Sequence, residues 1–444
     1  MSFKAEDLLQ RLLELESLAT APKRYLIALS GGLDSTVLAH ALASTRLQHG
    51  KALIAIHVDH RLQNESGAWA EQCEQFATEL GLEFLCEAVD VEVQGGDGPE
   101  AAARDARYAA LAKHVADGDW LLSAHHQDDQ AETLMLNLLR GSGPAGLAGM
   151  RPMRQFSRGW LSRPLLGVSR DDLMAYAMRE ELRWIDDPSN EDVDFDRNFL
   201  RNKVLPLITG RWPGAAARMA RSAELARDAS NLLSELAELD IKSLGGVCDR
   251  LSVTGLHKLS KSRQFNLLRQ AAKLSELPVP ATPQLLAIVE QLLPAREDAE
   301  PLVSWPGGEA RRYRDTLYLQ PTFSAADFAK GQPFGDGEVL IGPGLGTLAL
   351  GSCDGPGLSE TVVAQGLCLR RREGGEEIQL PGQSHTKKLK KLLQEKGVLP
   401  WFRQQLPLIY SGGQLVAVAD LWIAAGALAE KGRAIRWRNK PDLY

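Results

Sequence analysis

The chain has 444 residues, too many for one ordinary hydrophobic core, so we expect two or three domains. Hydrophobic residues make up 44% and charged residues 24%, as in globular proteins, and the formal net charge of -6 excludes a chain that is basic throughout. The five cysteines are scattered without a CxxC pair, which argues against a disulfide framework or a zinc knuckle. The N-terminus lacks a signal-peptide pattern and no apolar run reaches membrane-spanning length, so we expect a cytoplasmic protein with no membrane partner.

The charge is uneven along the chain. From Thr361 to the C-terminus, fourteen basic residues oppose seven acidic ones. Because the chain as a whole is acidic, this local excess predicts an anionic partner for the C-terminal region, such as RNA.

Strands and helices alternate in the first 140 residues. Apolar runs predict strands at 25–29, 52–58, 84–89 and 120–124, and helical spacing predicts helices at 5–17, 35–43, 65–80, 100–115 and 129–139. Short connections between alternating elements predict a doubly wound parallel α/β sheet. In such a sheet the ligand binds at the carboxyl ends of the strands.

The pattern changes after about residue 212. Helical spacing continues at 215–239, 258–273 and 283–293, β-like segments follow at 303–350, and strands at 367–371, 406–410 and 415–419 flank a basic helix. We therefore expect a first domain at 1–212, a helical domain at 213–320, a β-like linker at 321–359 and a basic α+β domain at 360–444.

The stretch SGGLDS, residues 30–35, follows the first predicted strand and opens a helix. Glycines let a phosphate approach the backbone, and N–H groups at a helix N-terminus bind anions. A carboxylate beside a polyphosphate needs a cation between them, so Asp34 predicts Mg²⁺. A tight turn with Asp34 or Ser35 as helix cap is the alternative. The stretch resembles the phosphate loop of the ATP pyrophosphatases, which release pyrophosphate and transfer an adenylyl group.

Two further motifs surround this predicted site. His57 and Asp59 of HVDHRL, residues 57–62, share one face of a strand end, where they could contact adenosine or be satisfied by the loop backbone. Arg104, Arg107 and Tyr108 share one helical face. Paired arginines can hold a phosphate or the RNA backbone, and a solvated helix face is the alternative.

The fourth motif, AHHQDDQAET, follows the fourth predicted strand. Asp129 and Glu132 are three residues apart, so both carboxylates project from the first turn of one helix. His125, His126 and Asp128 complete a dense cluster at a strand end. A carboxylate of this cluster could bind Mg²⁺ or the ammonium group of an amine substrate. The alternative is that acidic residues simply favour a helix N-terminus.

Together these motifs resemble the tRNA(Ile)-lysidine synthetase family. The resemblance includes LLRG, RPLL (163–166) and WIDDPSNEDVDFDRNFLR (184–201), spans about residues 22–205, and continues more weakly in GQSHTKKLKKLLQEKGVLPWFRQQLPLIY. One departure is Arg61, where relatives often have Gly. These enzymes adenylate the C2 oxygen of the first anticodon cytidine in a CAU-anticodon isoleucine tRNA. Lysine then displaces AMP, which gives lysidine.

The resemblance implies roles for the motif residues. ATP would be bound, with Mg²⁺ on Asp34, by Ser30, Gly31, Gly32, Leu33, Asp34, Ser35, His57 and Asp59. Asp129 and Glu132 would hold free L-lysine and Arg104 or Arg107 the phosphate or the cytidine, so the catalytic set is Asp34, Asp129, Glu132, Arg104 and Arg107. Lys387, Lys388, Lys390 and Lys391 would surround Leu389, Leu392 and Leu393 in an amphipathic basic helix and, together with Arg370, would meet tRNA. The helical domain at 213–320 would bind tRNA as well. A homodimer is compatible with this scheme.

Two other functions remain open. A thiolating tRNA enzyme of the same class needs reactive cysteines, but Cys73 falls in a predicted helix and Cys86 in a predicted strand, where we expect both to be packed. A non-catalytic nucleotide-binding or RNA-binding protein would gain nothing from carboxylates in its anion site.

Overall fold

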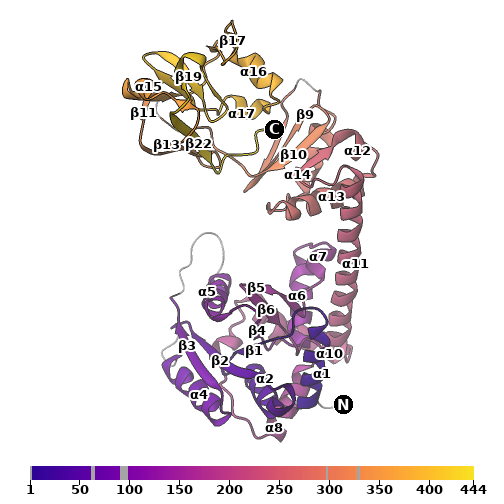
Figure 1. Cartoon of the computed structure of the whole chain (residues 1–444). Helices are drawn as coiled ribbons and strands as arrows, with labels where there is room; N and C mark the ends of the chain where they lie inside the picture. The colour runs from indigo at the N-terminus through magenta and orange to yellow at the C-terminus, as the bar shows by residue number, and fades with distance from the viewer. Residues whose placement is uncertain (1–2, 62–65, 91–98, 297–298, 327, 329–330) are drawn as a thin grey trace. The chain divides into compact units, whose positions relative to one another are not determined.

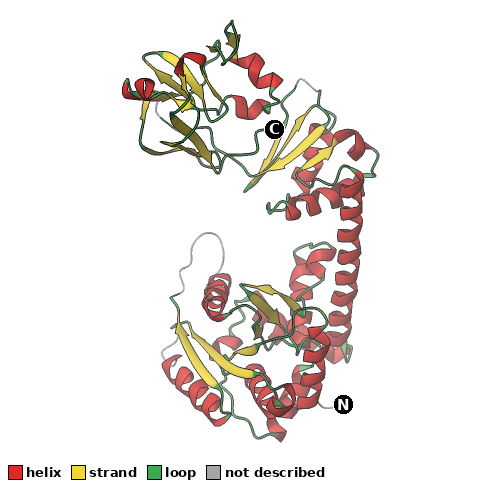
Figure 2. Cartoon of the chain, viewed as in Figure 1, coloured by secondary structure: helices red, strands yellow, loops and turns green. Residues whose placement is uncertain are grey.

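The computed structural model describes the chain except residues 1–2, 62–65, 91–98, 297–298, 327 and 329–330 (Figure 1). Leu62 of the second motif and the predicted start of the helix at residue 65 lie outside the described residues. The chain forms two compact units, Met1–Leu232 and Leu233–Tyr444, which are described separately below. Both units combine helices with strands (Figure 2).

The first unit is built on a six-stranded sheet in the order β3-β2-β1-β4-β6-β5. Its strands are β1 (Arg24–Ala28), β2 (Ala52–Asp59), β3 (Glu83–Ala88), β4 (Trp120–Leu122), β5 (Met153–Phe156) and β6 (Gly159–Ser162). All neighbouring strands are parallel except β5 and β6, which form an antiparallel hairpin. The predicted parallel sheet is confirmed, but the hairpin was missed because four-residue strands are too short to show clear alternation.

Helices cover both faces of this sheet, and the chain winds in two directions from β1. The helical segments are α1 (Ala5–Glu16), α2 (Leu33–Ser44), α3 (Arg46–His49), α4 (Ser66–Glu79), α5 (Pro99–His114), α6 (Gln127–Leu139), α7 (Pro144–Leu147), α8 (Arg170–Arg179), η1 (Pro188–Glu191), α9 (Asp196–Phe199), η2 (Leu200–Val204) and α10 (Leu205–Arg211). Apolar side chains of the strands, such as Leu26 and Ile27, pack into separate clusters on opposite sides of the sheet. Because β1 lies between β2 and β4, the point where the strand order reverses is at the ends of β1 and β4.

The region after residue 212 contains a sheet as well as the expected helices. Helix α11 (Ala215–Ser243) runs from the first unit into the second and is followed by α12 (Val253–His257), α13 (Lys261–Leu274), α14 (Thr282–Ala287) and η3 (Ile288–Leu292). They accompany an antiparallel sheet, β7-β10-β9-β8, made of β7 (Arg250–Ser252), β8 (Leu302–Trp305), β9 (Gly308–Tyr313) and β10 (Thr316–Gln320). The three-residue β7 lies where only helical spacing was recognised.

The C-terminal part of the second unit has two five-stranded sheets, β11-β15-β18-β19-β20 and β12-β13-β22-β14-β21. Its elements are β11 (Gln332–Phe334), β12 (Gly337–Gly342), β13 (Gly346–Ser352), β14 (Gly357–Leu358), α15 (Glu360–Ala364), β15 (Leu367–Arg370), β16 (Glu377–Ile378), β17 (Lys387–Lys388), α16 (Leu389–Glu395), α17 (Pro400–Arg403), β18 (Leu408–Ser411), β19 (Gln414–Val418), β20 (Trp422–Ile423), η4 (Ala425–Ala427), β21 (Leu428–Ala429) and β22 (Arg433–Arg438). The segment expected to be a linker, 321–359, thus supplies β11 to β14, and β13 pairs with β22 along six residue pairs. Among the described residues, no helix has the length and apolar character to cross a membrane.

Candidate active site

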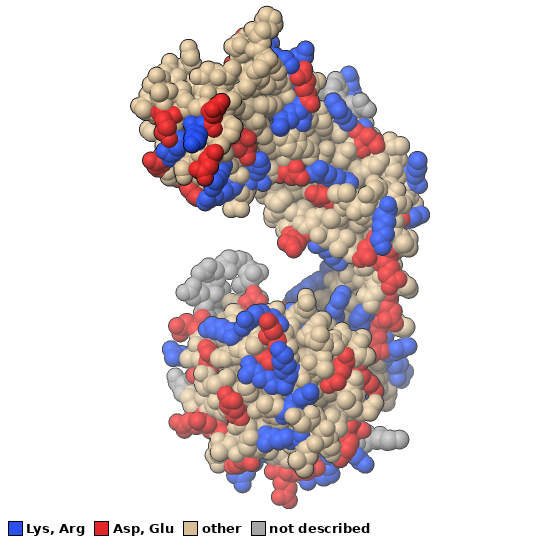
Figure 3. All heavy atoms as spheres, viewed as in Figure 1, with Lys and Arg blue, Asp and Glu red and all other residues tan. Residues whose placement is uncertain are grey.

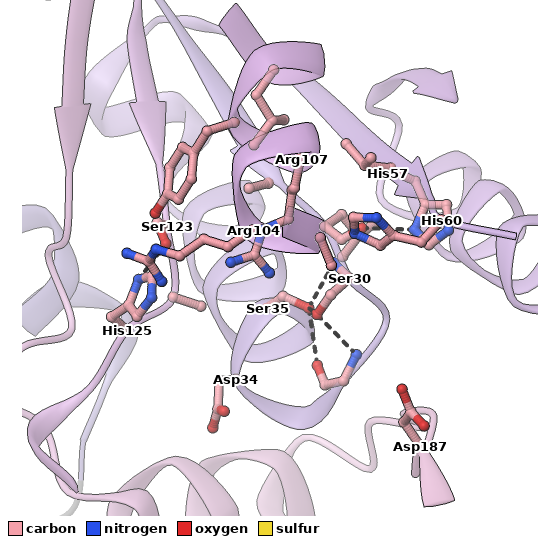
Figure 4. Close-up of a pocket in the computed structure, with 18 of the residues that line it drawn as sticks. Ser30, Asp34, Ser35, His57, His60, Arg104, Arg107, Ser123, His125 and Asp187 are labelled. Atoms are coloured by element: carbon pink, nitrogen blue, oxygen red, sulfur yellow. Dashed lines mark hydrogen bonds between the residues drawn. The ribbon is translucent and has the colours of Figure 1, made fainter. Parts of the chain in front are cut away.

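The motifs that follow β1 and β4 meet in one cavity of about 670 Å³, within the size range of small-molecule sites. Of the residues singled out in the sequence, the cavity is lined by Ser30, Gly32, Asp34, Ser35, His57, Asp59, Arg61, Arg104, Arg107, Tyr108, His125 and Asp129. Gly31, Leu33 and Glu132 are not among the residues that line the cavity. Figure 4 shows His57 and His60 on one side of the loop residues Ser30 and Ser35, and Ser123 and His125 on the other.

The SGGLDS loop is held in shape by its own hydroxyl groups. The Oγ atoms of Ser30 and Ser35 lie 3.0 Å apart, and the Ser35 hydroxyl also donates to the carbonyl of Gly32 at 3.0 Å (Figure 4). Gly31 has a φ of +85°, and a Cβ atom there would lie 2.5 Å from Cδ1 of Ile185. Glycine is therefore required at position 31. The loop leads into α2, whose first N–H groups lack intrahelical partners.

His126 joins the first and fourth motifs. Its Nε2 atom lies 3.5 Å from Oδ2 of Asp34 and 3.5 Å from Oδ2 of Asp129. Its Nδ1 atom lies 3.2 Å from the backbone N of Asp128 and 3.6 Å from Oδ2 of that residue. Nδ1 either accepts from the backbone, as in neutral imidazole, or donates to the carboxylate, as in imidazolium. Three carboxylates within 3.6 Å favour the imidazolium.

The cluster therefore contains a buried cation between buried or half-buried anions. Burial lowers the pKa of His126, but the hydrogen bonds and charges of Asp128, Asp34 and Asp129 outweigh burial and raise it to about 10. Burial raises the pKa of Asp129, and the nearby His126, His125 and arginine side chains reverse this and lower it to about 2. Both groups are charged at neutral pH, so the carboxylate of Asp129 accepts hydrogen bonds and does not act as a proton donor.

Glu132 is fully buried and has two arginine partners. Its Oε2 atom accepts from Nε of Arg197 at 2.9 Å, and its Oε1 atom accepts from Nε of Arg201 at 2.6 Å. Arg201 also donates to Oδ1 of Asp129 at 2.9 Å. Because Arg197 and Arg201 lie on the cavity wall while Glu132 does not, Glu132 faces the cavity only through these two arginines.

The two arginines come from an irregular helix. Arg197 belongs to α9 and Arg201 to the π-helical turn η2, which precedes Pro206. Proline has no N–H to donate to the carbonyl four residues earlier, and π turns of this kind are frequent at functional sites. The motif DFDRNFLR thus places two guanidinium groups, four residues apart, on paired carboxylates of α6.

His125 is kept neutral at the cavity wall. Its Nδ1 atom lies 2.6 Å from Oγ of Ser123, a residue that follows β4 directly. Burial lowers the pKa of His125 to about 3, so the ring is uncharged at neutral pH. The hydroxyl fixes the orientation of the ring in the cavity.

The second motif is ordered by the backbone, as its alternative interpretation allowed. His57 is buried and its Nδ1 atom lies 2.9 Å from the carbonyl oxygen of Leu29. Asp59 accepts from the backbone N–H of Arg61 at 2.8 Å. Arg61 has a φ of +52°, a left-handed conformation that favours glycine. The backbone at Arg61 therefore has a conformation that glycine would adopt more readily.

The arginines of the third motif gather on Tyr108, and both reach the cavity. The guanidinium carbons of Arg104 and Arg107 lie 5.1 and 5.6 Å from the centre of the tyrosine ring. Among the described residues, no carboxylate forms an ion pair with either of them. This arrangement is not a solvated helix face, since both arginines are half-buried.

Cys73 and Cys86, the two cysteines of the first unit, do not have the character of reactive thiols. Cys73 is buried, as expected, and burial raises its thiol pKa to about 12. The prediction that Cys86 is packed was wrong, because β3 is an edge strand and Cys86 is exposed on it. Its thiol pKa is nevertheless raised, by partial burial and neighbouring carboxylates, which opposes thiolate formation.

The basic segment of the second unit differs in part from the prediction. Leu389, Leu392 and Leu393 are buried on one side of α16, but the helix begins only at Leu389. Lys387 and Lys388 instead form the short strand β17.

The basic groups of this segment have unequal surroundings. Lys387 and Lys391 lie 3.7 and 3.9 Å from the carboxylate of Glu395. The guanidinium of Arg370 stacks 4.5 Å from the ring centre of Tyr410. Lys and Arg side chains alternate with acidic ones over the visible face of this unit (Figure 3).

Sequence reasoning missed the side chains that pair with the predicted carboxylates. His126, Arg197 and Arg201 were noticed only as parts of motifs, without a role. A local signal existed for the arginines, since a basic pair at i and i+4 matches an acidic pair at i and i+3, but nothing in the sequence joined these distant helices. No signal pointed to Ser123.

Comparison with known proteins gives a match over the first unit. A model of the PP-loop domain matches residues 3–208. The phosphate loop at the switch point of a parallel sheet and this match define the chain as a PP-loop protein.

The rest of the chain identifies the family more narrowly. The TilS substrate binding domain matches residues 251–318, and the TilS substrate C-terminal domain matches residues 367–438. The tRNA(Ile)-lysidine synthase of Alkalilimnicola ehrlichii is 42% identical over 421 residues, which are 94% of each chain. That of Coxiella burnetii is 38% identical over 429 residues, or 96% of this chain and 95% of its own. The chain belongs to the tRNA(Ile)-lysidine synthase family.

Proposed function

We propose that the chain ligates L-lysine to C2 of the first anticodon cytidine in a CAU-anticodon isoleucine tRNA. ATP is consumed, AMP and pyrophosphate are released, and the modified base is lysidine. Family membership over nearly the whole chain supports the reaction. The observation in the structure that carries the proposal is the joining of Asp34 and Asp129 by His126 in a cavity that also contains two arginines without carboxylate partners among the described residues.

The residues of the cavity fit a magnesium ion on Asp34. Its Oδ1 atom is buried and has no hydrogen-bond partner among the described residues. Those residues contain no group of three or more His, Cys, Asp or Glu side chains that could hold a metal alone. Mg²⁺ usually takes one or two carboxylates together with substrate phosphates and waters, which fits Asp34 at a phosphate loop. Bound there, the ion would neutralise charge on the leaving pyrophosphate.

The first step in this proposal is adenylation of the cytidine. The C2 oxygen attacks the α-phosphorus of ATP, and the bond from phosphorus to the pyrophosphate oxygen breaks. The backbone N–H groups of Gly32 to Asp34 bind the pyrophosphate. His57 and Asp59 line the part of the cavity assigned to adenosine, and Arg104 or Arg107 binds the phosphate or the cytidine.

The second step is displacement of AMP by lysine. The ε-ammonium group first gives one proton to solvent, and the neutral amine then attacks C2. The C2–O bond to AMP breaks so that AMP leaves, and the nitrogen gives its second proton to solvent. Asp129, charged at neutral pH, holds the ammonium groups of lysine before reaction. We assign Glu132 to the same end of the cavity, where it acts by fixing Arg197 and Arg201.

The second unit supplies further tRNA contacts in this proposal. Basic side chains at Arg370, Lys387, Lys388, Lys390 and Lys391 meet phosphates of the tRNA outside the anticodon. Because its substrate is a tRNA, the protein acts in the cytoplasm, and homodimer formation is compatible with these roles.

The test follows labelled lysine into RNA. Purified protein, ATP, Mg²⁺ and labelled lysine are mixed with an isoleucine tRNA transcript with a CAU anticodon, or with initiator methionine tRNA as the matched control. We expect ATP-dependent label in the isoleucine tRNA alone. Label in neither RNA, with pyrophosphate still released, would remove lysine or this tRNA as substrate. Sulfur transfer without lysine would support the thiolating alternative.

A further inference from the structure

The RPLL motif places a buried arginine beside the arginines of α5. Arg163 is 4% exposed, and its Nη1 atom donates to the carbonyl oxygen of Arg151 at 2.8 Å. Its Nε atom has no hydrogen-bond partner among the described residues. Its guanidinium acts electrostatically on the phenol of Tyr108. The function proposed above gives this arginine no role.

Arg154, on β5, also lies close to the ring of Tyr108. Its guanidinium carbon lies 5.8 Å from the ring centre of Tyr108 and 5.3 Å from that of Phe156. The two rings pack edge to face at 5.7 Å. Arg154 is exposed, so a ligand can reach it from solvent.

More cations gather here than one aromatic ring can stabilise. A ring has two faces for cation–π contact, whereas the guanidinium carbons of Arg104, Arg107 and Arg154 all lie within 6 Å of the Tyr108 centre. Arg163 adds a fourth positive charge. Within the described part of the chain, none of the four forms an ion pair with a carboxylate.

The local excess of positive charge also affects the titrating groups. Burial raises the pKa of Tyr108, but Arg104, Arg163 and Arg107 outweigh it, so the net pKa is lowered. Burial lowers the pKa of Arg163; the phenol of Tyr108 opposes this, and Arg154 and Arg104 lower it further. Such a cluster is stabilised by an anion that the chain itself does not supply.

The cluster extends beyond the cavity. Arg104, Arg107 and Tyr108 line the cavity, but Arg154 and Arg163 do not. A ligand that occupies the cavity and also contacts the arginines beside it must have one part inside the cavity and a connected anionic part outside it. A nucleotide within an RNA strand has this form, because its own base enters a cavity while the next phosphate stays outside.

We propose that Arg104 and Arg154 contact an RNA phosphate next to the nucleotide that enters the cavity, and that the buried Arg163 behind them adds positive charge to this binding site. We call these three residues the arginine site. The inference rests on the proposed function for the identity of the RNA. It adds which face of the first unit holds the strand and which residues bind it.

The test measures tRNA binding by the full-length Arg154→Ala variant without ATP. Arg154 is exposed on a short edge strand, so the variant folds, as a thermal melt will show. The matched control is Arg158→Ala, an exposed arginine of the same hairpin that lies 3.8 Å from Asp117. We expect Arg154→Ala to weaken binding about tenfold, as for loss of a charged hydrogen bond. We also expect the slope of the logarithm of the binding constant against the logarithm of the salt concentration to become shallower by about 0.7, as for the loss of one single-strand phosphate contact.

Neutral methylphosphonate linkages then identify the phosphate. They are placed one at a time beside the target cytidine of the isoleucine tRNA. We expect that at one position the neutral linkage weakens tRNA binding to the unsubstituted protein but not to Arg154→Ala. Three results would overturn the arginine site. The first is that Arg154→Ala binds tRNA as tightly as the unsubstituted protein, and the second is that Arg158→Ala loses as much affinity as Arg154→Ala. The third is that no linkage position distinguishes the unsubstituted protein from Arg154→Ala.

Failure of the proposed function gives a different result. If the unsubstituted protein incorporates no lysine but the loss of binding in Arg154→Ala persists, the arginine site stands and the reaction is wrong. If lysine is incorporated but Arg154→Ala binds tRNA normally, the reaction stands and the arginine site is wrong.

Discussion

Two groups of charged side chains border the cavity of the first unit, and they are neutralised in opposite ways. In the acidic group, Asp34, Asp129 and Glu132 each lie within 3.5 Å of a cationic side chain of the same chain. In the arginine site the described residues offer no carboxylate. The first group already has cationic partners before substrate binds, so it determines stability and the position of the reacting groups. The second is completed by its ligand, so it determines RNA affinity and the dependence of binding on salt.

The largest effect on stability is expected where the acidic group is most buried. Glu132→Gln removes the negative charge but leaves Arg197 and Arg201 half-buried without it. Breaking a buried ion pair costs about 3 to 5 kcal/mol, and we expect a loss of that size in urea unfolding, together with lower activity. The control is Glu224→Gln, which removes the exposed pair with Arg221 and should cost less than about 1 kcal/mol. Similar losses in both variants would contradict a preformed acidic group.

The phosphate loop gives the next effect. Gly31→Ala forces a Cβ atom to 2.5 Å from Cδ1 of Ile185 and 2.9 Å from Sγ of Cys73, in addition to strain at a φ of +85°. We expect a loss of about 1 to 3 kcal/mol and a raised KM for ATP. Gly50→Ala has similar strain at a φ of +63° but no atom within 4 Å, so it isolates the strain. If both substitutions changed the KM for ATP equally, contact of the added Cβ atom with Ile185 and Cys73 would not explain the effect at Gly31.

The pH dependence of stability tests the cation between the carboxylates. The folded pKa of His126 is about 10, above its usual value of 6.5, so its contribution is complete below pH 6.5 and is lost as the pH rises through about 10. Asp129, with a folded pKa of about 2, contributes above pH 3.8 and loses its contribution as the pH falls through about 2. We expect the stability lost in His126→Asn to be larger at pH 6 than at pH 9, measured by urea unfolding. A constant difference would show that His126 is not charged in the folded protein.

The smallest effect is expected in the basic segment of the second unit. For Lys388 and Lys390 the described residues offer no carboxylate at ion-pair distance, whereas Lys387 and Lys391 share Glu395. We expect Lys388→Ala with Lys390→Ala to weaken tRNA binding several-fold at low salt, and more than Lys387→Ala with Lys391→Ala. The opposite order would mean that the pairs with Glu395 do not compete with RNA.

The sequence predicted the parts of the molecule that depend on local patterns. Apolar runs and helical spacing located β1 to β4 and the helices between them, and the leucines of α16 set its buried side. The strand at Lys387 and Lys388 was missed because the leucine spacing constrains the chain only from Leu389 onward. The partners of Glu132 were missed because they lie 65 and 69 residues away in the chain, and ion pairs at that separation leave no local pattern. Local periodicity thus predicts elements, while burial and long-range pairing decide which charges meet.

The most direct test of the division between the two groups compares steady-state kinetics of Asp34→Asn and Arg154→Ala with tRNA as the varied substrate. The acidic group is expected to act on the reaction, so Asp34→Asn should lower kcat at least a hundredfold and leave tRNA affinity unchanged. The arginine site is expected to act on binding, so Arg154→Ala should raise the KM for tRNA about tenfold and leave kcat unchanged. If Asp34→Asn instead loses tRNA affinity with kcat intact, or Arg154→Ala lowers kcat at saturating tRNA, the two groups do not divide chemistry from binding.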